Sequence, residues 1–395
     1  MFAVLSRPRK LIARVSVLFS MFWLAACDPI AMNGSASTGG PSIDPGAPVA
    51  VALLVPWGGG NAGDDALSDS LEKAARLAVS DLEGVKIDLR VYGTGGNPAR
   101  AQESALQAVA DGAKIILGPV YAESANAVAV AVANKGVNVL SFSNNTTIAG
   151  GNLFVLGNTF ENTATRLVSF ATRQGKRKIV IAHDQNIPGQ LGAQAIVQAA
   201  SVSGATIVAS IGYELSQQGV FGAVPAIKEQ TGNGGADALF LTANTAGALP
   251  ILAQLLPEQG VSSPTTQFIG LTRWDVPVQA LDMPGLQGGW FALPAPAVAA
   301  AFSSRYQAAY GAAPHAIGGL AYDGIAAIGA LVKQGKSDAL TSAALTQGAG
   351  FQGTGGVFRL LPNGTNQRGL AVATIRDKQV VVIDPAPKFF GGAGF

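Results

Sequence analysis

The chain has 395 residues, of which 48% are hydrophobic and only 13% charged, and this composition can fill a large buried core. The formal net charge is +2, but four of the 26 basic residues and none of the 24 acidic ones lie in the first 26 positions, so the remainder carries 22 basic against 24 acidic residues. That near-neutral remainder gives no reason to expect nucleic acid or an acidic polymer as a partner.

The N-terminus carries the pattern of a secretory signal. Four basic residues precede an apolar run at positions 15–24, which is far shorter than the roughly 20 residues that a membrane-spanning helix needs. A retained membrane anchor, the alternative, fits that length poorly. Next, Leu24-Ala25-Ala26-Cys27 resembles a bacterial lipobox, and Cys27 is the only cysteine of the chain. We therefore predict a signal peptide at 1–26, lipidation of Cys27, and a periplasmic protein whose lipid anchors it to the inner or outer membrane.

Residues 27–48 are rich in Gly, Pro, Ser, Ala and Asn and show no hydrophobic period. This composition predicts a flexible tether between the lipid and the folded body. About 347 residues remain from Val49 onward, and that length predicts two domains rather than one.

In the body, short β-branched apolar runs alternate with longer amphipathic stretches. The first series predicts strands at 49–55, 85–92, 114–117 and 137–142 and helices at 64–82, 98–110 and 122–133. The second predicts helices at 162–173, 190–203, 220–229 and 246–256 and strands at 178–182, 206–213, 238–242 and 267–269. Two such series predict an α/β protein of two Rossmann-like doubly wound lobes, each a parallel sheet covered by helices.

The C-terminal part of the chain adds elements of both kinds. Apolar periodicity predicts helices at 298–310, 318–334 and 337–346, followed by strands at 357–361, 370–376 and 380–383. Turn residues, including Asn363-Gly364, separate these strands. The chain is therefore expected to end in a strand meander.

Short motifs at the strand ends make the body resemble the leucine-binding branch of the type I periplasmic binding proteins. They are Leu54-Val55-Pro56 with Gly58, Leu117-Gly118-Pro119, Ser141-Phe142-Ser143-Asn144-Asn145, His183-Asp184, Tyr322-Asp323 and Phe351-Gln352-Gly353-Thr354-Gly355. The likeness extends from Val49 to Ile383, and within this superfamily the chain is most similar to the penicillin-binding protein activators.

The resemblance implies a hinge of three segments that cross between the lobes. These crossings are expected near Gly157, near Gly288 and near Gly350. The first lobe would then comprise 49–157 and about 288–350, and the second 158–287 and about 351–395.

The glycine-rich loop at 58–63 matches the G-x-G-x-x-G fingerprint of dinucleotide-binding proteins, between a strand and a helix. That fingerprint also needs an acidic residue at the end of the second strand, where this chain has Val91-Tyr92-Gly93-Thr94. We therefore interpret it as a cleft loop and expect no cofactor.

Catalysis and metal binding find little support in the sequence. The chain has only two histidines, His183 and His315, without a second histidine or a cysteine at metal-ligand spacing. The body contains no Gly-x-Ser-x-Gly nucleophile motif. We expect no catalytic residue and no metal site, with His183 a loop or cleft hydrogen-bonding residue and His315 structural.

Ligands of doubly wound sheets bind at the carboxyl ends of the strands. The polar and aromatic residues expected there, and taken as ligand-cleft candidates, are Trp57, Tyr121, Ser141, Ser143, Asn144, Asn145, Asp184, Asn244, Thr245, Arg273 and Trp274, with Glu123, Gln185 and Asp275 nearby. By the resemblance, Ser143 and Asn145 match positions that hold an amino-acid backbone.

Two departures from the leucine-binding pattern put a standard amino-acid site in doubt. Pro188 stands where an aromatic lid residue is usual, and the loop 243–246 lacks the acid that pairs with a ligand's ammonium group. A buried ammonium without a counter-charge is costly. Arg273 and Trp274 could rebuild a different site or could cap the cleft rim.

Two non-enzymatic functions follow. The first, favoured by the missing amino-acid anchors, is a penicillin-binding protein activator that contacts a peptidoglycan synthase and regulates peptidoglycan synthesis. The alternative is the substrate-binding protein of an ABC transporter, which would close on an amino acid or another small polar solute and deliver it to a permease.

Overall fold

The first lobe is built on a five-stranded parallel sheet with strand order β2-β1-β3-β4-β5. The computed structural model describes residues 40–232 and 235–391. The strands are β1 (Val49–Val55), β2 (Ile87–Gly93), β3 (Ile115–Leu117), β4 (Asn138–Ser141) and β5 (Leu153–Val155). β1, β3 and β4 are almost wholly buried, as their continuous apolar sequences predict for strands covered on both faces.

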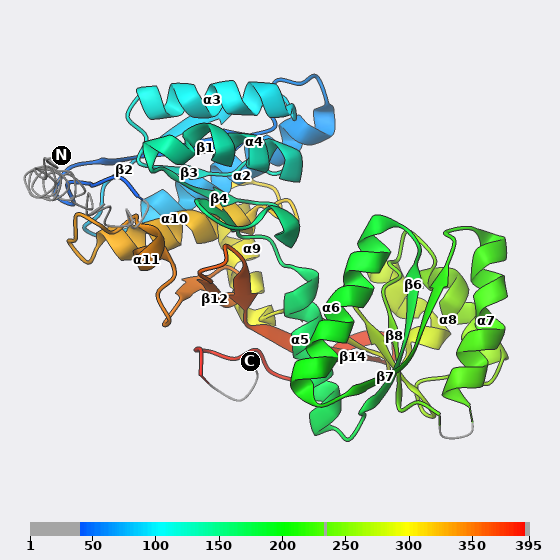
Figure 1. The fold of residues 1–395 in the computed structure, drawn as a ribbon. Helices are drawn as coiled ribbons and strands as arrows, with labels where there is room; N and C mark the ends of the chain where they lie inside the picture. Colours follow the sequence, from blue (N-terminus) through cyan, green and yellow to red (C-terminus); the bar gives the residue numbers. More distant parts are fainter. Residues whose placement is uncertain (1–39, 233–234, 392–395) are drawn as a thin grey trace, which may run out of the picture. The chain divides into compact units, whose positions relative to one another are not determined.

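Helices cover both faces of this sheet. They are α2 (Ala62–Asp81), α3 (Pro98–Ala110), α4 (Ala122–Val132), α9 (Pro296–Tyr310), α10 (Gly319–Val332) and α11 (Ser342–Leu345). α2 and α10 share one apolar core, and α3 and α4 pack in the other. Figure 1 shows α10 beside α2, although the two helices lie far apart in the sequence. Gly324 permits this approach, because a Cβ there would lie 2.3 Å from Leu117 Cδ1.

The second lobe has a seven-stranded sheet with strand order β15-β14-β10-β9-β8-β6-β7. Its strands are β6 (Lys178–Asp184), β7 (Thr206–Tyr213), β8 (Ala238–Leu241), β9 (Gln267–Gly270), β10 (Trp290–Pro294), β14 (Leu370–Arg376) and β15 (Gln379–Asp384). Helices α5 (Phe160–Arg173) and α6 (Ile187–Ser203) cover one face, and α7 (Gln217–Thr231) and α8 (Leu249–Glu258) cover the other. The predicted α/β fold of two doubly wound lobes is thus confirmed.

The expected meander divides between the two lobes. Strands β11 (Phe351–Gly353), β12 (Gly356–Leu360) and β13 (Asn366–Arg368) form a small antiparallel sheet of their own. Phe351 and Phe358 of this sheet belong to the apolar core of the first lobe, whereas β14 and β15 extend the second sheet. The helix expected at 337–346 is reduced to α11.

The three crossings between the lobes follow from this strand pairing. Gly157 lies on the first, where a Cβ would come 2.6 Å from the Ser143 carbonyl oxygen. The second follows Pro294 rather than Gly288, because β10 still pairs with β9 and β14 of the second sheet. The third lies at Gly369, between β13 and β14, rather than near Gly350, because β11 still packs with the first lobe.

Part of the expected tether is packed against the first lobe. The signal peptide, Cys27 and the segment up to residue 39 lie outside the described residues. In the remaining part, Ile43 is buried in the first core and its N–H donates to the Ser337 carbonyl oxygen at 2.9 Å. The folded body therefore begins before Val49, since an apolar side chain and a backbone contact hold this segment.

A buried ion pair ties α10 to the crossings. The Arg368 guanidinium lies 2.9 Å from Asp323 Oδ2, and their side chains are 10% and 1% exposed. Arg368 Nε also donates to the Leu156 carbonyl oxygen at 3.0 Å, next to the first crossing. The second oxygen of Asp323 accepts the Thr354 N–H at 2.6 Å. Both charges are thereby compensated.

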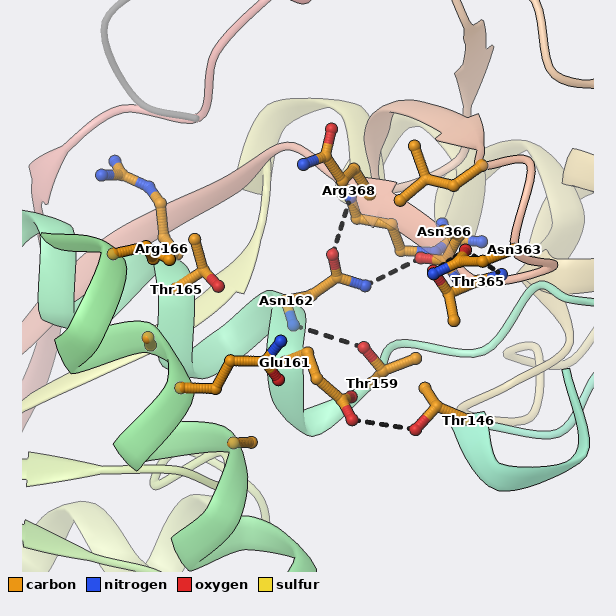
Figure 2. A pocket seen from close by; sticks show the side chains of 16 residues that line it. Thr146, Thr159, Glu161, Asn162, Thr165, Arg166, Asn363, Thr365, Asn366 and Arg368 are labelled. Carbon is orange, nitrogen blue, oxygen red and sulfur yellow. Dashed lines mark hydrogen bonds between the residues drawn. The ribbon is translucent and has the colours of Figure 1, made fainter.

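Two asparagines extend this network onto α5, as Figure 2 shows. Asn162 Oδ1 accepts the Arg368 N–H at 3.2 Å, and Asn162 Nδ2 donates to Asn366 Oδ1 at 2.8 Å. Asn366 Nδ2 in turn donates to the carbonyl oxygens of Val155 and Gly157 at 2.8 and 2.9 Å. The first and third crossings are therefore held side by side through polar side chains.

Replacing Asp323 with alanine should destabilise the body by about 3–5 kcal/mol, because it leaves the Arg368 charge buried without its partner. Urea unfolding followed by circular dichroism measures this free energy. As a control, Asp69→Ala removes the exposed Lys73–Asp69 pair on α2 and should cost about 1 kcal/mol or less. Equal effects of the two substitutions would show that the hinge ion pair has no special role.

Candidate functional site

The strand ends of the first lobe present two exposed aromatic residues. Trp57 follows β1 with 56% of its surface exposed, and its ring covers Gly93, where a Cβ would approach it to 2.5 Å. Tyr121 precedes α4, is 41% exposed and donates its hydroxyl to Asp64 on α2. Both side chains are therefore accessible to a solute.

Contacts of the glycine-rich loop disfavour the dinucleotide interpretation. The Asn61 side chain accepts the Gly63 and Asp64 N–H groups and so caps the start of α2. Arg100 Nη1 donates to the Gly58 carbonyl oxygen at 2.8 Å. A bound phosphate would need the first backbone N–H groups of α2, and the Asn61 side chain already occupies two of them. The loop therefore has a structural role.

The serine and asparagine residues at the end of β4 and just after it bond mainly to the protein backbone. Ser141 is fully buried and donates to the Pro119 carbonyl oxygen at 2.9 Å. The Ser143 hydroxyl accepts the Asn145 N–H at 3.1 Å, and Asn145 Oδ1 caps the next 3₁₀ turn, η2 (Thr146–Ile148). Asn144 is the exposed member of this set. Ser141 is thus out of reach of a solute.

In the second lobe, Asp184 lies beneath the strand ends. It is 7% exposed, and its Oδ1 has no hydrogen-bond partner among the described residues. Burial raises the pKa of Asp184, and the nearby Tyr213 and His183 offset this shift only in part. Burial, together with the charge of Asp184, also raises the pKa of Tyr213. Because its side chain is buried, Asp184 belongs to the interior of the second lobe rather than to the cleft surface.

Trp274 belongs to the hydrophobic core and not to the cleft. Its side chain is fully buried and stacks on Phe291 with ring centroids 6.4 Å apart. It fits because Gly270 and Gly289 lack side chains, where a Cβ would lie 2.2 and 2.3 Å from the ring. The adjacent Arg273 points outward and is 41% exposed.

A cavity of about 470 Å³ collects three of the candidate residues. We call it the cleft pocket. Asn244, Thr245 and Arg273 line it from the loops after β8 and β9. The first lobe contributes the start of α10. The hinge contributes the end of β10 and the residues on either side of Gly369. These further lining residues include Ala316, Ile317, Gly319, Leu320, Asp323, Leu293, Pro294, Thr354, Val357, Arg368 and Leu370.

The first-lobe candidates do not line the cleft pocket, and its wall at 316–323 was not expected from the sequence. The only signal for that wall was the motif Tyr322-Asp323. Its Asp323 is a lining residue already engaged in the hinge network. The residues before it carry no chemical signature, since they are alanine, isoleucine, glycine and leucine.

Hydrogen bonds hold the second-lobe wall of the cleft pocket in place. The Thr245 hydroxyl donates to the Val276 carbonyl oxygen at 2.9 Å, and Asn244 Oδ1 accepts the Ala246 N–H at 3.0 Å. Arg273 pairs with both oxygens of Asp275, whose side chain is 12% exposed. The loops therefore present a preorganised set of polar groups to the cavity.

A second cavity, of about 430 Å³, lies at the hinge between α5, α6 and β13 (Figure 2). Its side chains mostly bond one another: the Thr146 hydroxyl donates to Glu161 Oε1 at 2.8 Å, and Asn162 bonds Asn366. The buried Arg166 donates to Asp384 and to the Leu370 carbonyl oxygen, while burial lowers its pKa. None of the candidates lines this cavity, so the cleft pocket is the candidate site.

Among the described residues, 40–232 and 235–391, no cluster of His, Cys, Asp and Glu side chains could hold a metal ion. None of their helices combines the length and apolarity needed to cross a membrane. His183 Nδ1 lies 3.0 Å from the Asp184 carbonyl oxygen, and the His315 N–H donates to Ser70.

Known proteins resemble this chain in sequence pattern and fold. Residues 48–379 match the family model of the periplasmic binding proteins. A protein from Rhodospirillum rubrum, described as a candidate branched-chain amino acid ABC transporter, is 18% identical over 85% of this chain and 100% of its own, with a TM-score of 0.73. The comparison with curated proteins found no match.

Two further solved structures hold different ligands. The ABC transporter substrate-binding protein of Desulfitobacterium hafniense in complex with leucine is 17% identical over 85% of this chain and 100% of its own, with a TM-score of 0.62. The solute-binding protein of an ABC transporter from Rhodopseudomonas palustris, in complex with 3,4-dihydroxybenzoic acid, is 19% identical over 86% and 98%, with a TM-score of 0.57. At such identities the likeness shows the shared fold.

Adjacent substitutions should separate core from cleft. Trp274→Ala should lower the free energy of unfolding by about 3–5 kcal/mol, because it empties a large buried volume. Arg273→Ala removes a half-exposed ion pair and should cost about 1 kcal/mol or less. Denaturant titration of both variants measures this. If Trp274→Ala proved as mild as Arg273→Ala, the assignment of Trp274 to the core would be wrong.

Proposed function

This chain belongs to the periplasmic binding protein family, and we propose that it is a non-enzymatic receptor that binds a small solute for an ABC transporter. The observation that carries the proposal is the cleft pocket. Its walls come from the carboxyl ends of β8 and β9, from the start of α10 and from the hinge. A mostly apolar cavity with a few convergent polar groups is the usual form of a small-molecule site.

The size of the pocket and the hinge beside it also support a receptor. A volume of about 470 Å³ falls within the range typical of ligand pockets. Three chain crossings join the lobes, and a solute that touches both would favour their closed arrangement. The pocket meets that requirement, since Arg273 belongs to the second lobe and Ile317 precedes α10 of the first.

A penicillin-binding protein activator is the second candidate, which the missing amino-acid anchors suggested. The described residues add no observation that favours it. The solved structures named above are proteins of ABC transporters. We therefore place the receptor first and let an experiment distinguish the two.

A thermal-shift screen of the full chain tests the receptor proposal. The panel contains amino acids, carboxylic acids, sugars, short peptides and peptidoglycan fragments. A ligand at 100 times its dissociation constant stabilises the folded state by about 2.7 kcal/mol. For a domain of this size we expect the melting temperature to rise by about 5–10 °C. The Asp69→Ala variant, altered on the exposed face of α2, should show the same shift.

A flat screen would contradict the receptor proposal. The activator is tested separately by adding the full chain to a bifunctional peptidoglycan synthase and measuring its glycosyltransferase and transpeptidase rates. We expect both rates to stay unchanged. An increase in either rate would favour the activator instead.

We further propose that the protein is exported and anchored in the periplasm through a lipid on Cys27. The support is the basic and apolar start of the chain and the lipobox-like Leu24-Ala25-Ala26-Cys27. Cys27→Ser should abolish incorporation of labelled fatty acid and release the protein from the membrane fraction. Ser35→Ala, in the segment that follows, serves as the matched control. Equal labelling of the two variants would contradict lipidation at Cys27.

A further inference from the structure

The carboxylates of the cleft pocket are already paired. Asp323 is the only acidic residue among the described lining residues, and its two oxygens are bound by Arg368 and by the Thr354 N–H. Asp275 lies next to the pocket, and Arg273 occupies both of its oxygens. A ligand with an ammonium group would therefore find no free carboxylate in the pocket to pair with it, which is costly.

Two nitrogens on the second-lobe wall are left to donate hydrogen bonds, whereas the hydroxyls of Thr245 and Thr272 donate to backbone carbonyl oxygens. Arg273 bonds Asp275 through Nε and Nη2, and its Nη1 has no partner among the described residues. Asn244 uses only its oxygen, on the Ala246 N–H, so its amide nitrogen is also left to donate. Such donors favour a ligand that presents acceptor oxygens, and a guanidinium matches a carboxylate in shape and charge.

Most of the remaining wall of the pocket is apolar, with Asn158, Thr272 and Thr354 as its other polar residues. Its hinge side consists of Ala292, Leu293 and Pro294 with Val357 and Leu370, and its α10 side of Ala316, Ile317 and Leu320. An aliphatic or aromatic body can be buried against these side chains, whereas a sugar or a polyol would leave its hydroxyls without partners there.

We propose that the cleft pocket selects a small carboxylic acid with an apolar body and no charged amino group, and that Arg273 holds the carboxylate. This inference rests on the proposed receptor function and adds the chemical class of the solute. Asn244 also contributes to specificity. An aspartate at this position would supply a counter-charge for an ammonium group, and asparagine does not.

Matched ligands test the inference by isothermal titration calorimetry on the full chain. One series is 4-methylpentanoate, L-leucine and 3-methylbutylamine, which share an aliphatic body and differ in charged groups. The second is 3-phenylpropanoate, L-phenylalanine and 2-phenylethylamine. In at least one series we expect the carboxylate to bind about 10-fold or more tightly than the amino acid, and the amine to bind weakest.

Three substitutions at two residues assign the preference to Arg273 and Asn244. Arg273→Gln should weaken carboxylate binding by about 10- to 100-fold, since it removes the charge-assisted hydrogen bonds. Arg273→Lys should recover part of that loss. Asn244→Asp keeps the oxygen that accepts the Ala246 N–H and adds a negative charge, so it should shift the preference about 10-fold toward the amino acid. Melting temperatures of the unliganded variants check that each is folded.

Each outcome separates this inference from the proposed function. If the amino acid or the amine binds as well as the carboxylate, the solute class is wrong and the receptor function stands. The same holds if the two series fail while another solute of the thermal-shift panel binds. If no solute binds at all, the receptor function itself fails and the inference falls with it. Carboxylate binding that Arg273→Gln leaves unchanged would overturn the role of Arg273.

Discussion

The buried ion pair of Arg368 and Asp323 is the contact on which the rest of the body depends. Two charges can be withdrawn from water only if each finds its partner and its remaining hydrogen bonds. Here the partners come from α10, from the third crossing, from Leu156 beside the first crossing and from Thr354. Segments that lie far apart in the sequence must therefore meet at one point. The cleft pocket lies against that point, because Asp323 and Arg368 are also among its lining residues.

The strand ends show how neighbouring residues acquire opposite roles. After β9, Arg273 lies at the cleft pocket while Trp274 turns inward onto Phe291, into space left by two glycines. At the end of β4, the buried Ser141 hydroxyl donates to the Pro119 carbonyl oxygen in the loop after β3, while Asn144 stays exposed. In both places a polar or aromatic residue at a strand end looked like a ligand contact in the sequence. What decides the role is whether the local backbone offers that side chain a partner or a cavity.

The parts of the fold that depend on local pattern were predictable, and those that depend on partners were not. The alternation of strands and helices gave the two doubly wound lobes, because period and apolar content determine local structure. Gly288 and Gly350 were expected at crossings, yet β10 pairs on past Gly288 and β11 packs with Phe358 of the first core. The α10 wall of the cleft pocket was missed for a related reason, since Ile317 and Leu320 look like any core residues.

The sequence by itself determined the α/β class, the two-lobed organisation, and the lack of an acidic residue in the loop 243–246. These properties follow from composition and short-range pattern, which the chain carries whatever its tertiary contacts. Only the tertiary structure decided where the crossings lie, which of Arg273 and Trp274 faces the cleft, and that Asp323 is already paired. Those outcomes depend on which distant segments bury one another's surfaces and satisfy one another's polar groups, and no local signal in the chain encodes that.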